Sequence, residues 1–448
     1  MTIAASSLPP IYCPPCQPTP CYSEELAYDE TRLDAAPLTG AISALPTGIF
    51  TRVHGPATVV LFNQDNAARI PTYGKRGSVR GTLIMAQERD HICEVTARLE
   101  GRMEITTAHA GAQTTKTFST SYSLWSSVNA STSAAPSCPE TINFECVLPA
   151  TFIYNGEEHH LPPSFTARFP GAPSLFANCT YGLTLSITKD RRVGFLSKTK
   201  VSVQSLRCLK LSDGAYCRIH IPIEYRPQTS PPRGLSRASY FPAAVKVAPQ
   251  DWIQTSFEVP PRCSTANVER IQCRVFIPSV RVFGLADTIP VHLELASTLA
   301  SLRELVIPSS SNTFHSEPIT TCCPADMEPL SKSPLRAYLS RMVRFDSPDG
   351  KTTWRMQRIG AGTFPPMPPA VVQERCTCQE PCAQTLDWDG EISVDKAVRV
   401  GGFSAGGLIV RDFITLEIVP PNATASPLKT VQHTIPIRLV TETFTSST

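Results

Sequence analysis

The sequence has little charge of either sign in excess. Its 41 basic and 38 acidic side chains leave a formal charge of +3 over 448 residues, and only 18% of the residues are charged. Proteins that bind DNA or RNA usually carry a clustered basic excess, so we expect no nucleic-acid partner. Disorder throughout is excluded as well, because 42% of the residues are hydrophobic and can bury a core.

Long apolar runs are also missing. A membrane-spanning helix needs roughly 20 apolar residues, and the nearest candidate, Leu408 to Pro420, is interrupted by Arg411, Asp412 and Glu417. The first ten residues, MTIAASSLPP, lack the basic and apolar regions of a secretory signal. These two observations predict a cytoplasmic protein.

Proline, in contrast, is abundant. The chain has 42 prolines, about twice the usual frequency, and each proline inside a helix costs about 3 kcal/mol. A largely helical protein is therefore excluded. From about residue 48 the sequence alternates with period 2, most clearly from Cys93 to Thr106, where apolar or small residues occupy every second position. This pattern predicts a strand with one buried side.

Similar alternation recurs along the chain, at residues 142–148, 181–187, 219–223, 271–277, 289–295, 414–418 and 435–439. Many short one-sided strands joined by Pro- and Ser-rich loops indicate an all-β protein built of antiparallel sandwiches. The segment 226–237 (RPQTSPPRGLSR) predicts the boundary between two halves. We expect a disordered Pro/Cys-rich arm at residues 1–47 and a first sandwich at 48–228. A linker at 229–237 leads to a second sandwich at 238–443, and a short tail follows at 444–448.

Sixteen cysteines are too few for a small disulfide scaffold, and a reducing compartment disfavours disulfides. Cys93, Cys146 and Cys273 lie at alternating apolar positions, so we expect them to be small core residues. Two further groups, Cys13, Cys16 and Cys21, and Cys376, Cys378 and Cys382, lack the paired spacing of zinc sites. We predict no metal and no cofactor; exposed reduced thiols or reversible acylation sites are the interpretations left open.

The arm contains one recognition motif, Pro9-Pro10-Ile11-Tyr12. A PPxY segment in a polyproline II conformation fits the aromatic groove of a WW domain with little loss of entropy. The alternative is chance, because a proline-rich arm produces such motifs without selection. Pro9, Pro10 and Tyr12 are our candidate ligand of a WW-domain protein.

Basic residues cluster around a predicted hairpin turn, at Lys189, Arg191, Arg192, Lys198 and Lys200. This cluster is a candidate site for an anionic lipid or a phosphorylated cargo tail, and a solvated turn is the alternative. The pair His159 and His160 follows a Tyr-Asn-Gly turn. Metal binding or pH sensing is one interpretation, but a polar hairpin tip explains these histidines better.

The segment Gly402 to Gly406 matches the GxSxG pattern of serine hydrolases, with Ser404 as nucleophile. That motif works at a sharp strand-to-helix turn and needs an acid and a histidine later in the chain. Here a strand-like segment follows, and only His433 lies downstream. A glycine-rich turn or bulge is the favoured interpretation, so we predict that the protein is not an enzyme.

The region from residue 48 to 443 resembles the arrestin-like proteins of filamentous and mushroom-forming fungi, within the α-arrestin group. The segments that carry the resemblance are VTARLEG (95–101), LPPSF (161–165), IEYRP (223–227), FIPSVRVFGLADTIP (276–290), LDWDGE (386–391), LIVRDFITLEIVPP (408–421) and IPIRLVTE (435–442). The resemblance implies two immunoglobulin-like β-sandwiches that form an adaptor. No arginine of the polar-core type known from receptor-regulating arrestins is identifiable in the sequence.

The family likeness also implies partners. An adaptor of this kind binds a membrane transporter or receptor as cargo, with peripheral membrane contact and transient recruitment to the plasma membrane or endosomes. It brings a WW-domain, HECT-type ubiquitin ligase through PPxY motifs, for which only Pro9, Pro10 and Tyr12 qualify here. Family PPxY motifs usually lie in a long C-terminal tail, and this single N-terminal motif departs from that pattern. The alternative function is a vesicle-sorting scaffold without a ubiquitin role.

Overall fold

The computed structural model describes residues 47–66, 68–86, 89–127, 137–189, 215–235, 241–263, 268–306, 334–366, 384–421 and 424–445. These residues lie within one compact unit, Ala44–Ser446. The fold is all-β, as the alternating pattern predicted. Its strand pairs are antiparallel except for the short parallel pairs β3–β12 and β15–β22. The division of the chain at residues 229–237 stays a prediction.

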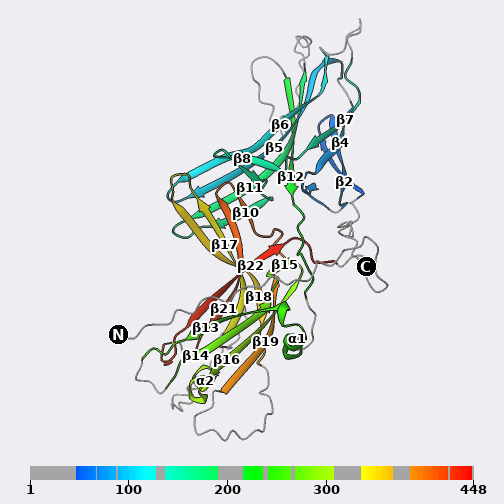
Figure 1. Cartoon of the computed structure of the whole chain (residues 1–448). Coiled ribbons are helices and arrows are strands. Elements are labelled where there is room, and N and C mark those ends of the chain that lie inside the picture. The colour runs from blue at the N-terminus through cyan, green and yellow to red at the C-terminus, as the bar shows by residue number, and fades with distance from the viewer. Residues whose placement is uncertain are drawn as a thin grey trace, which may run out of the picture. The chain divides into compact units, whose positions relative to one another are not determined.

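The first lobe, as we call strands β1 to β12, contains two larger sheets and the two-stranded sheet β8-β9 (Figure 1). One larger sheet has the order β1-β2-β4-β7, and the second larger sheet has the order β3-β12-β11-β5-β6, with β10 beside β11. The strand bounds are β1 Gly48–His54, β2 Ala57–Gln64, β3 Thr72–Tyr73, β4 Ser78–Met85, β5 Ile92–Thr107, β6 Gly111–Ser126, β7 Thr141–Val147, β8 Thr151–Tyr154, β9 Glu157–His160, β10 Phe165–Phe169, β11 Leu175–Lys189 and β12 Ala215–Tyr225; the short helix η1 is Arg89–His91.

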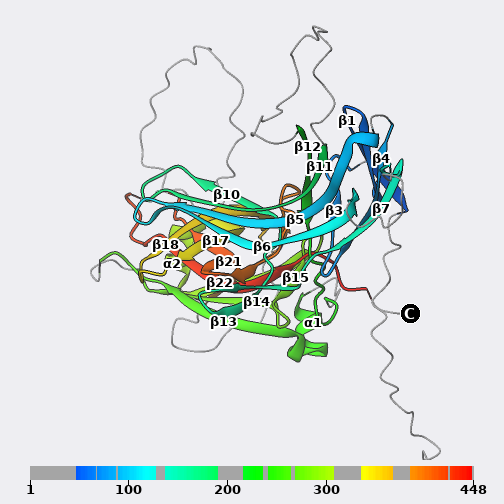
Figure 2. The ribbon, with the colours of Figure 1, turned by 90° about the horizontal axis from the view of Figure 1, so that it is seen from above.

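The second lobe, as we call strands β13 to β22, is a single curled sheet with the order β13-β14-β16-β19-β18-β17-β21-β22-β15, and β20 pairs with β21 (Figure 2). The bounds are α1 Phe241–Val247, η3 Pro249–Asp251, β13 Trp252–Val259, β14 Ile271–Pro278, β15 Val282–Gly284, β16 Thr288–Ser297, α2 Leu299–Val306, β17 Leu335–Asp346, β18 Thr352–Thr363, β19 Gln384–Val394, β20 Phe403–Ala405, β21 Leu408–Ile418 and β22 Val431–Val440.

Strand β5 shows how the alternating pattern forms the core. Val95, Ala97 and Leu99 are fully buried, whereas the intervening Arg98 is exposed. Each lobe buries its alternating apolar side chains in a core of its own. All the other alternating segments that the sequence marked also form strands, namely β7, β11, β12, β14, β16, β21 and β22.

The prediction for Cys93 was wrong in one respect. Cys93 is half-buried, not a core residue. The pairing of β5 with β11 shifts at this end, since Ile92 pairs with Lys189 and Glu94 with Thr188, which leaves Cys93 without an opposite residue. The extra residue of a β-bulge reverses the alternation, and Ile92 takes the buried position instead.

A third apolar cluster contains residues of both lobes. It joins Met103 and Ile105 of β5 to Val343 of β17 and Val410 of β21. The strands β17 and β21 therefore contribute to the core of the second lobe at one end and to this shared cluster at the other. Burial of such apolar surface, at about 25 cal/mol per Å², stabilises the contact between the lobes.

Candidate functional site

A cavity of about 1050 Å³ has walls from both lobes. Strands β5, β11 and β12 supply one wall, and β17, β18 and the segment after β19 supply the other. Nine arginine, histidine and carboxylate side chains line it: Glu100, Arg102, Glu104, His220, Glu224, Arg341, Arg358, Asp395 and Arg399. Four are arginines and four are carboxylates, so the charges of the lining are nearly balanced, and apolar side chains such as Phe165 and Ile359 lie among them.

Arg341, which lines the second-lobe wall, forms a buried ion pair with Asp412. Arg341 Nε donates a hydrogen bond of 2.7 Å to Asp412 Oδ1, and Nη2 donates one of 3.2 Å to Oδ2. The two residues are direct partners in the pairing of β17 with β21. Both occupy the face that Leu339 and Ile414 use for the core of the second lobe. A buried charge needs such a partner, because desolvation is costly.

Sequence reasoning missed this pair. Arg341 and Asp412 each occupy a core position of an otherwise apolar alternation, which was the available signal. From the sequence alone, Asp412 was noted only as an interruption of an apolar run, and no polar-core arginine was identified. What the sequence does not show is the register that sets these two residues side by side.

On the first-lobe wall the polar side chains are held by local contacts. Arg102 Nη2 lies 3.1 Å from Glu100 Oε1, and His220 Nδ1 lies 3.2 Å from Thr184 Oγ1. The Tyr181 hydroxyl donates a hydrogen bond to the backbone carbonyl of Pro162. Burial raises the pKa of Tyr181 well above its ordinary value, so this hydroxyl remains a donor in alkaline as well as in neutral solution.

A second cavity, of about 1840 Å³, adjoins the first, and Ile70, Glu224 and Asp395 line both. Its wall includes Tyr73, whose buried hydroxyl has no hydrogen-bond partner within the described ranges. Burial raises the pKa of Tyr73 far above the ordinary value. Arg226 Nη2 lies 2.6 Å from Glu224 Oε1 at the same wall. The wider lining is again mixed in charge.

Most of the binding residues expected from the sequence lie outside the described residues. These are the WW-ligand residues Pro9, Pro10 and Tyr12, and four of the five basic residues, Arg191, Arg192, Lys198 and Lys200. Lys189 is described: it is the last residue of β11 and pairs with Ala215 of β12. Both binding roles stay predictions.

The histidine pair lies on a hairpin, as the favoured interpretation had it, but at the end away from the turn and not at the tip, since His160 pairs with Thr151 and His159 with Phe152. Strands β8 and β9 form a hairpin, with His159 and His160 on β9. The turn residues Asn155 and Gly156 have φ values of 50° and 85°, as a tight turn of this type requires. His159 packs beside the rings of Phe152 and Tyr154. Among the described residues, no group of three or more side chains is arranged to bind a metal ion.

The GxSxG segment forms a strand, a turn and a second strand. Ser404 lies in β20, and Gly406 and Gly407 make the turn into β21, with φ values of 54° and 83°. The glycine-rich turn predicted from the sequence is confirmed, and the strand-to-helix geometry of a nucleophile elbow does not occur here. A Cβ on Gly406 would lie 2.9 Å from the Met103 side chain and 3.2 Å from that of Phe152, so this turn is seated against the first lobe.

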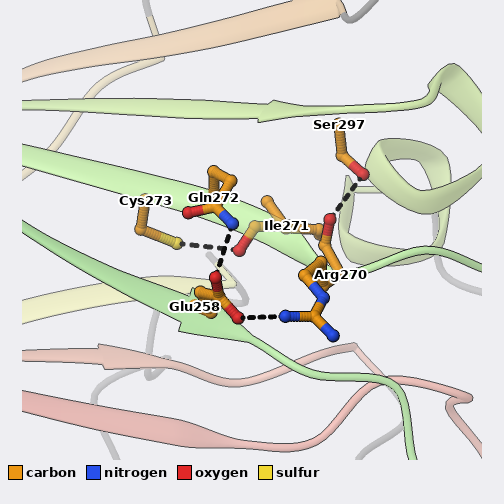
Figure 3. Close-up of polar contacts among 6 residues, drawn as sticks. All are labelled: Glu258, Arg270, Ile271, Gln272, Cys273 and Ser297. Carbon is orange, nitrogen blue, oxygen red and sulfur yellow. Dashed lines mark hydrogen bonds and ion pairs between the residues drawn. The ribbon is translucent and has the colours of Figure 1, made fainter. Parts of the chain in front are cut away.

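Two of the predicted core cysteines are confirmed. Cys146 and Cys273 are fully buried, and burial raises the pKa of their thiols to about 11 and about 12. Figure 3 shows Cys273 on β14, next to a polar group in which Glu258 accepts hydrogen bonds from Arg270 and Gln272. The two loop groups of cysteines lie outside the described residues.

No helix in the described ranges is long and apolar enough to cross a membrane.

Comparison with known proteins gives a distant structural likeness. No protein-family model matches the chain, and no curated protein matches it in sequence. A crystal structure of squid arrestin is similar over 90% of this chain and 100% of its own, with 7% identity and a TM-score of 0.34. The sporulation control protein Spo0M of Bacillus subtilis matches 54% of this chain and 77% of its own, with 10% identity and a TM-score of 0.15.

Both TM-scores are low, so this likeness carries no information about function. The assignment to the α-arrestin group and to fungi stays a prediction.

Proposed function

We propose that the protein is a non-enzymatic adaptor. In this proposal a polypeptide segment of a membrane transporter or receptor binds in the cavity between the lobes, and Pro9, Pro10 and Tyr12 recruit a WW-domain ubiquitin ligase. The cargo is then ubiquitylated and internalised. The adaptor works in the cytoplasm and is recruited transiently to the plasma membrane or endosomes.

The observation that carries the proposal is the cavity itself. Its volume of about 1050 Å³ is at the upper limit of small-molecule pockets, which are about 300–1,000 Å³ and mostly apolar. Arginine and carboxylate side chains from two lobes line this cavity. A polypeptide segment, with its own charges and backbone groups, suits such a lining better than a small apolar ligand does.

The WW half of the proposal is tested by pull-down with purified WW domains. The variant Pro9→Ala/Pro10→Ala/Tyr12→Ala should lose binding, because it removes both the polyproline II segment and the tyrosine that fixes its register. The matched control is Pro18→Ala/Pro20→Ala/Tyr22→Ala, which changes the same residue types a few positions later. Equal binding by the intact chain and the first variant would remove ligase recruitment from the proposal.

The cargo half is tested in cells by comparing ubiquitylated membrane proteins. The intact chain should raise ubiquitylation of its cargo, and the motif variant should bind the same cargo without that rise. The intact chain and the motif variant could instead both change the location of a membrane protein and leave its ubiquitylation the same. In that case the vesicle-sorting scaffold is the better description.

A further inference from the structure

The outward face of the ribbon β18-β17-β21 exposes large apolar side chains next to one another. Trp354 is 55% exposed and Met356 is 38% exposed. Their neighbours on β17 are Arg344, opposite Trp354, and Met342, opposite Met356. Single exposed hydrophobic residues are ordinary on a protein surface, but a tryptophan and two methionines on adjacent strands form a patch.

Strand alternation fixes which way this patch points. Leu339, Val343 and Phe345 of β17 are buried in the apolar clusters. Because side chains alternate along a strand, Met342 and Arg344 point to the opposite face. On β21, Arg411 is paired with Met342 and is exposed. We name the resulting surface the tryptophan–arginine face, with the members Met342, Arg344, Trp354, Met356, Arg358 and Arg411.

The charge of this face is positive. Arg344 Nε lies 2.8 Å from Asp346 Oδ1, which offsets its charge. Arg358 lies over the ring of Tyr338, 5.2 Å from its centroid, and its Nε donates to the carbonyl of Gly360 at 3.1 Å. In the described part of the chain, neither Arg358 nor Arg411 forms an ion pair. Arg411 therefore places a cation beside the apolar side chains, and Arg358, which also borders the cavity between the lobes, lies at the edge of the face.

The surroundings of the face argue against a groove. Neither cavity is lined by Trp354, Met356 or Arg411, and only Arg358 reaches the cavity between the lobes. Paired strands present these side chains as rows on a sheet surface. A bound peptide needs a pocket or a free strand edge, and β17, which forms the middle of this face, is paired on both sides. β18 pairs with β19 only from Gly360 to Thr363, so a strand could add along the earlier part of β18, but it would lie beside β18 and leave Met342 and Arg411 uncovered.

We infer that the tryptophan–arginine face docks on an anionic lipid surface. Tryptophan is favoured at the membrane–water interface, and arginine keeps its charge at the headgroups while its stem covers apolar surface. Each lysine or arginine near an anionic leaflet strengthens membrane binding about fivefold. This inference rests on the proposed recruitment of the adaptor to membranes and names the surface that makes the lipid contact; vesicle binding needs neither the WW motif nor a cargo protein, so the two proposals can fail separately.

Vesicle co-sedimentation of the full chain tests the inference. The probes are vesicles of phosphatidylcholine alone and vesicles that also contain phosphatidylserine. We expect binding only to the second kind, about fivefold weaker for Arg411→Gln and lost for Trp354→Ala/Arg358→Gln/Arg411→Gln. Arg52→Gln, which removes an exposed arginine of β1, is the matched control and should bind as the intact chain does.

Tryptophan fluorescence gives a second readout that is local to the face. Brominated lipids quench only an indole that reaches the bilayer, and of the described tryptophans only Trp354 is among the exposed residues. Anionic vesicles with brominated lipid should quench the intact chain. Trp354→Phe, which keeps an aromatic side chain and the fold, should abolish that quenching.

Several results would overturn the inference. One is absence of binding to anionic vesicles, and another is binding of the triple variant equal to that of the intact chain. Loss of binding in Lys198→Gln/Lys200→Gln, with binding kept in Trp354→Ala, would assign lipid contact to the basic cluster instead. Self-association that Trp354→Ala abolishes would assign the face to a second copy of the chain.

Discussion

Arg341 and Asp412 form a bidentate ion pair in which only 3% and 0% of their side chains are exposed. The pair sits at the point where the β17–β21 ribbon passes from one apolar cluster to another. On one side lie Leu339 and Ile414 of the second-lobe core, and on the other lies Val343 of the shared cluster. The ion pair therefore couples the register of these strands to the contact between the lobes.

Breaking this pair from one side should be costly. Arg341→Met leaves the carboxylate of Asp412 buried and without its partner, which costs about 3–5 kcal/mol of unfolding free energy. Arg341→Met/Asp412→Leu replaces both charges by apolar groups and should recover most of that loss. Denaturant unfolding at neutral pH measures both effects.

The control for the ion-pair experiment is an exposed pair. Arg80 Nε lies 3.0 Å from Glu145 Oε1, and 58% and 48% of the two side chains are exposed. Arg80→Met should change the stability by about 1 kcal/mol or less. If Arg341→Met cost no more than Arg80→Met, the buried pair would contribute nothing beyond a surface contact.

The sequence predicted those features that depend on neighbouring residues. The alternation around Leu99 and Leu183 is a local pattern, so it predicted the strands and their buried faces. The ion pair was not predictable in the same way, because its partners are 71 residues apart and meet only through strand register. The bulge at Cys93 also depends on pairing with β11, so alternation alone put this residue in the core.

The second prediction concerns the turn between β20 and β21. Gly407 has φ +83°, and a Cβ there would lie 2.6 Å from the backbone oxygen of Asp346. Gly407→Ala should therefore cost about 1–3 kcal/mol from overlap, in addition to the cost of a left-handed backbone, about 1–2 kcal/mol. Thermal unfolding measures the sum.

A matched glycine separates these two costs. Gly156 has nearly the same backbone angle, φ +85°, but a Cβ at this position would have no atom within 4 Å. Gly156→Ala should show only the backbone cost. Equal losses at the two positions would mean that the turn relaxes freely and that the close approach to Asp346 contributes nothing.

The third prediction concerns thiol chemistry and pH. Burial raises the pKa of Cys146 from 9.0 to about 11 and that of Cys273 from 9.0 to about 12. The thiolate is the reactive form, so iodoacetamide at about pH 8 should spare both residues and modify the exposed Cys263. Peptide mass spectrometry gives the extent of reaction, and modification of all three in denaturant is the control.

The same raised pKa values fix the direction of the pH effect on stability. Each buried thiol is protonated in the folded protein at a pH where the unfolded chain already loses the proton. Its contribution is complete below about pH 9 and is lost as the pH rises toward 11 for Cys146 and 12 for Cys273. Cys146→Ala/Cys273→Ala should flatten this decline in the unfolding midpoint. An equally steep decline in that variant would contradict the assignment.

The last prediction concerns the attachment of α1 to the second lobe. The ring of Phe241 is stacked on His292 with centroids 3.9 Å apart, and it meets Trp252 edge-on at 4.8 Å. Phe241→Ala should cost about 3 kcal/mol and shift the Trp252 emission to longer wavelength, because water reaches the indole. Val247→Ala, at a position that is 84% exposed on the same helix, should change stability by about 0.5 kcal/mol or less. If Phe241→Ala behaved like Val247→Ala, the aromatic stack would not be what holds this helix against the sheet.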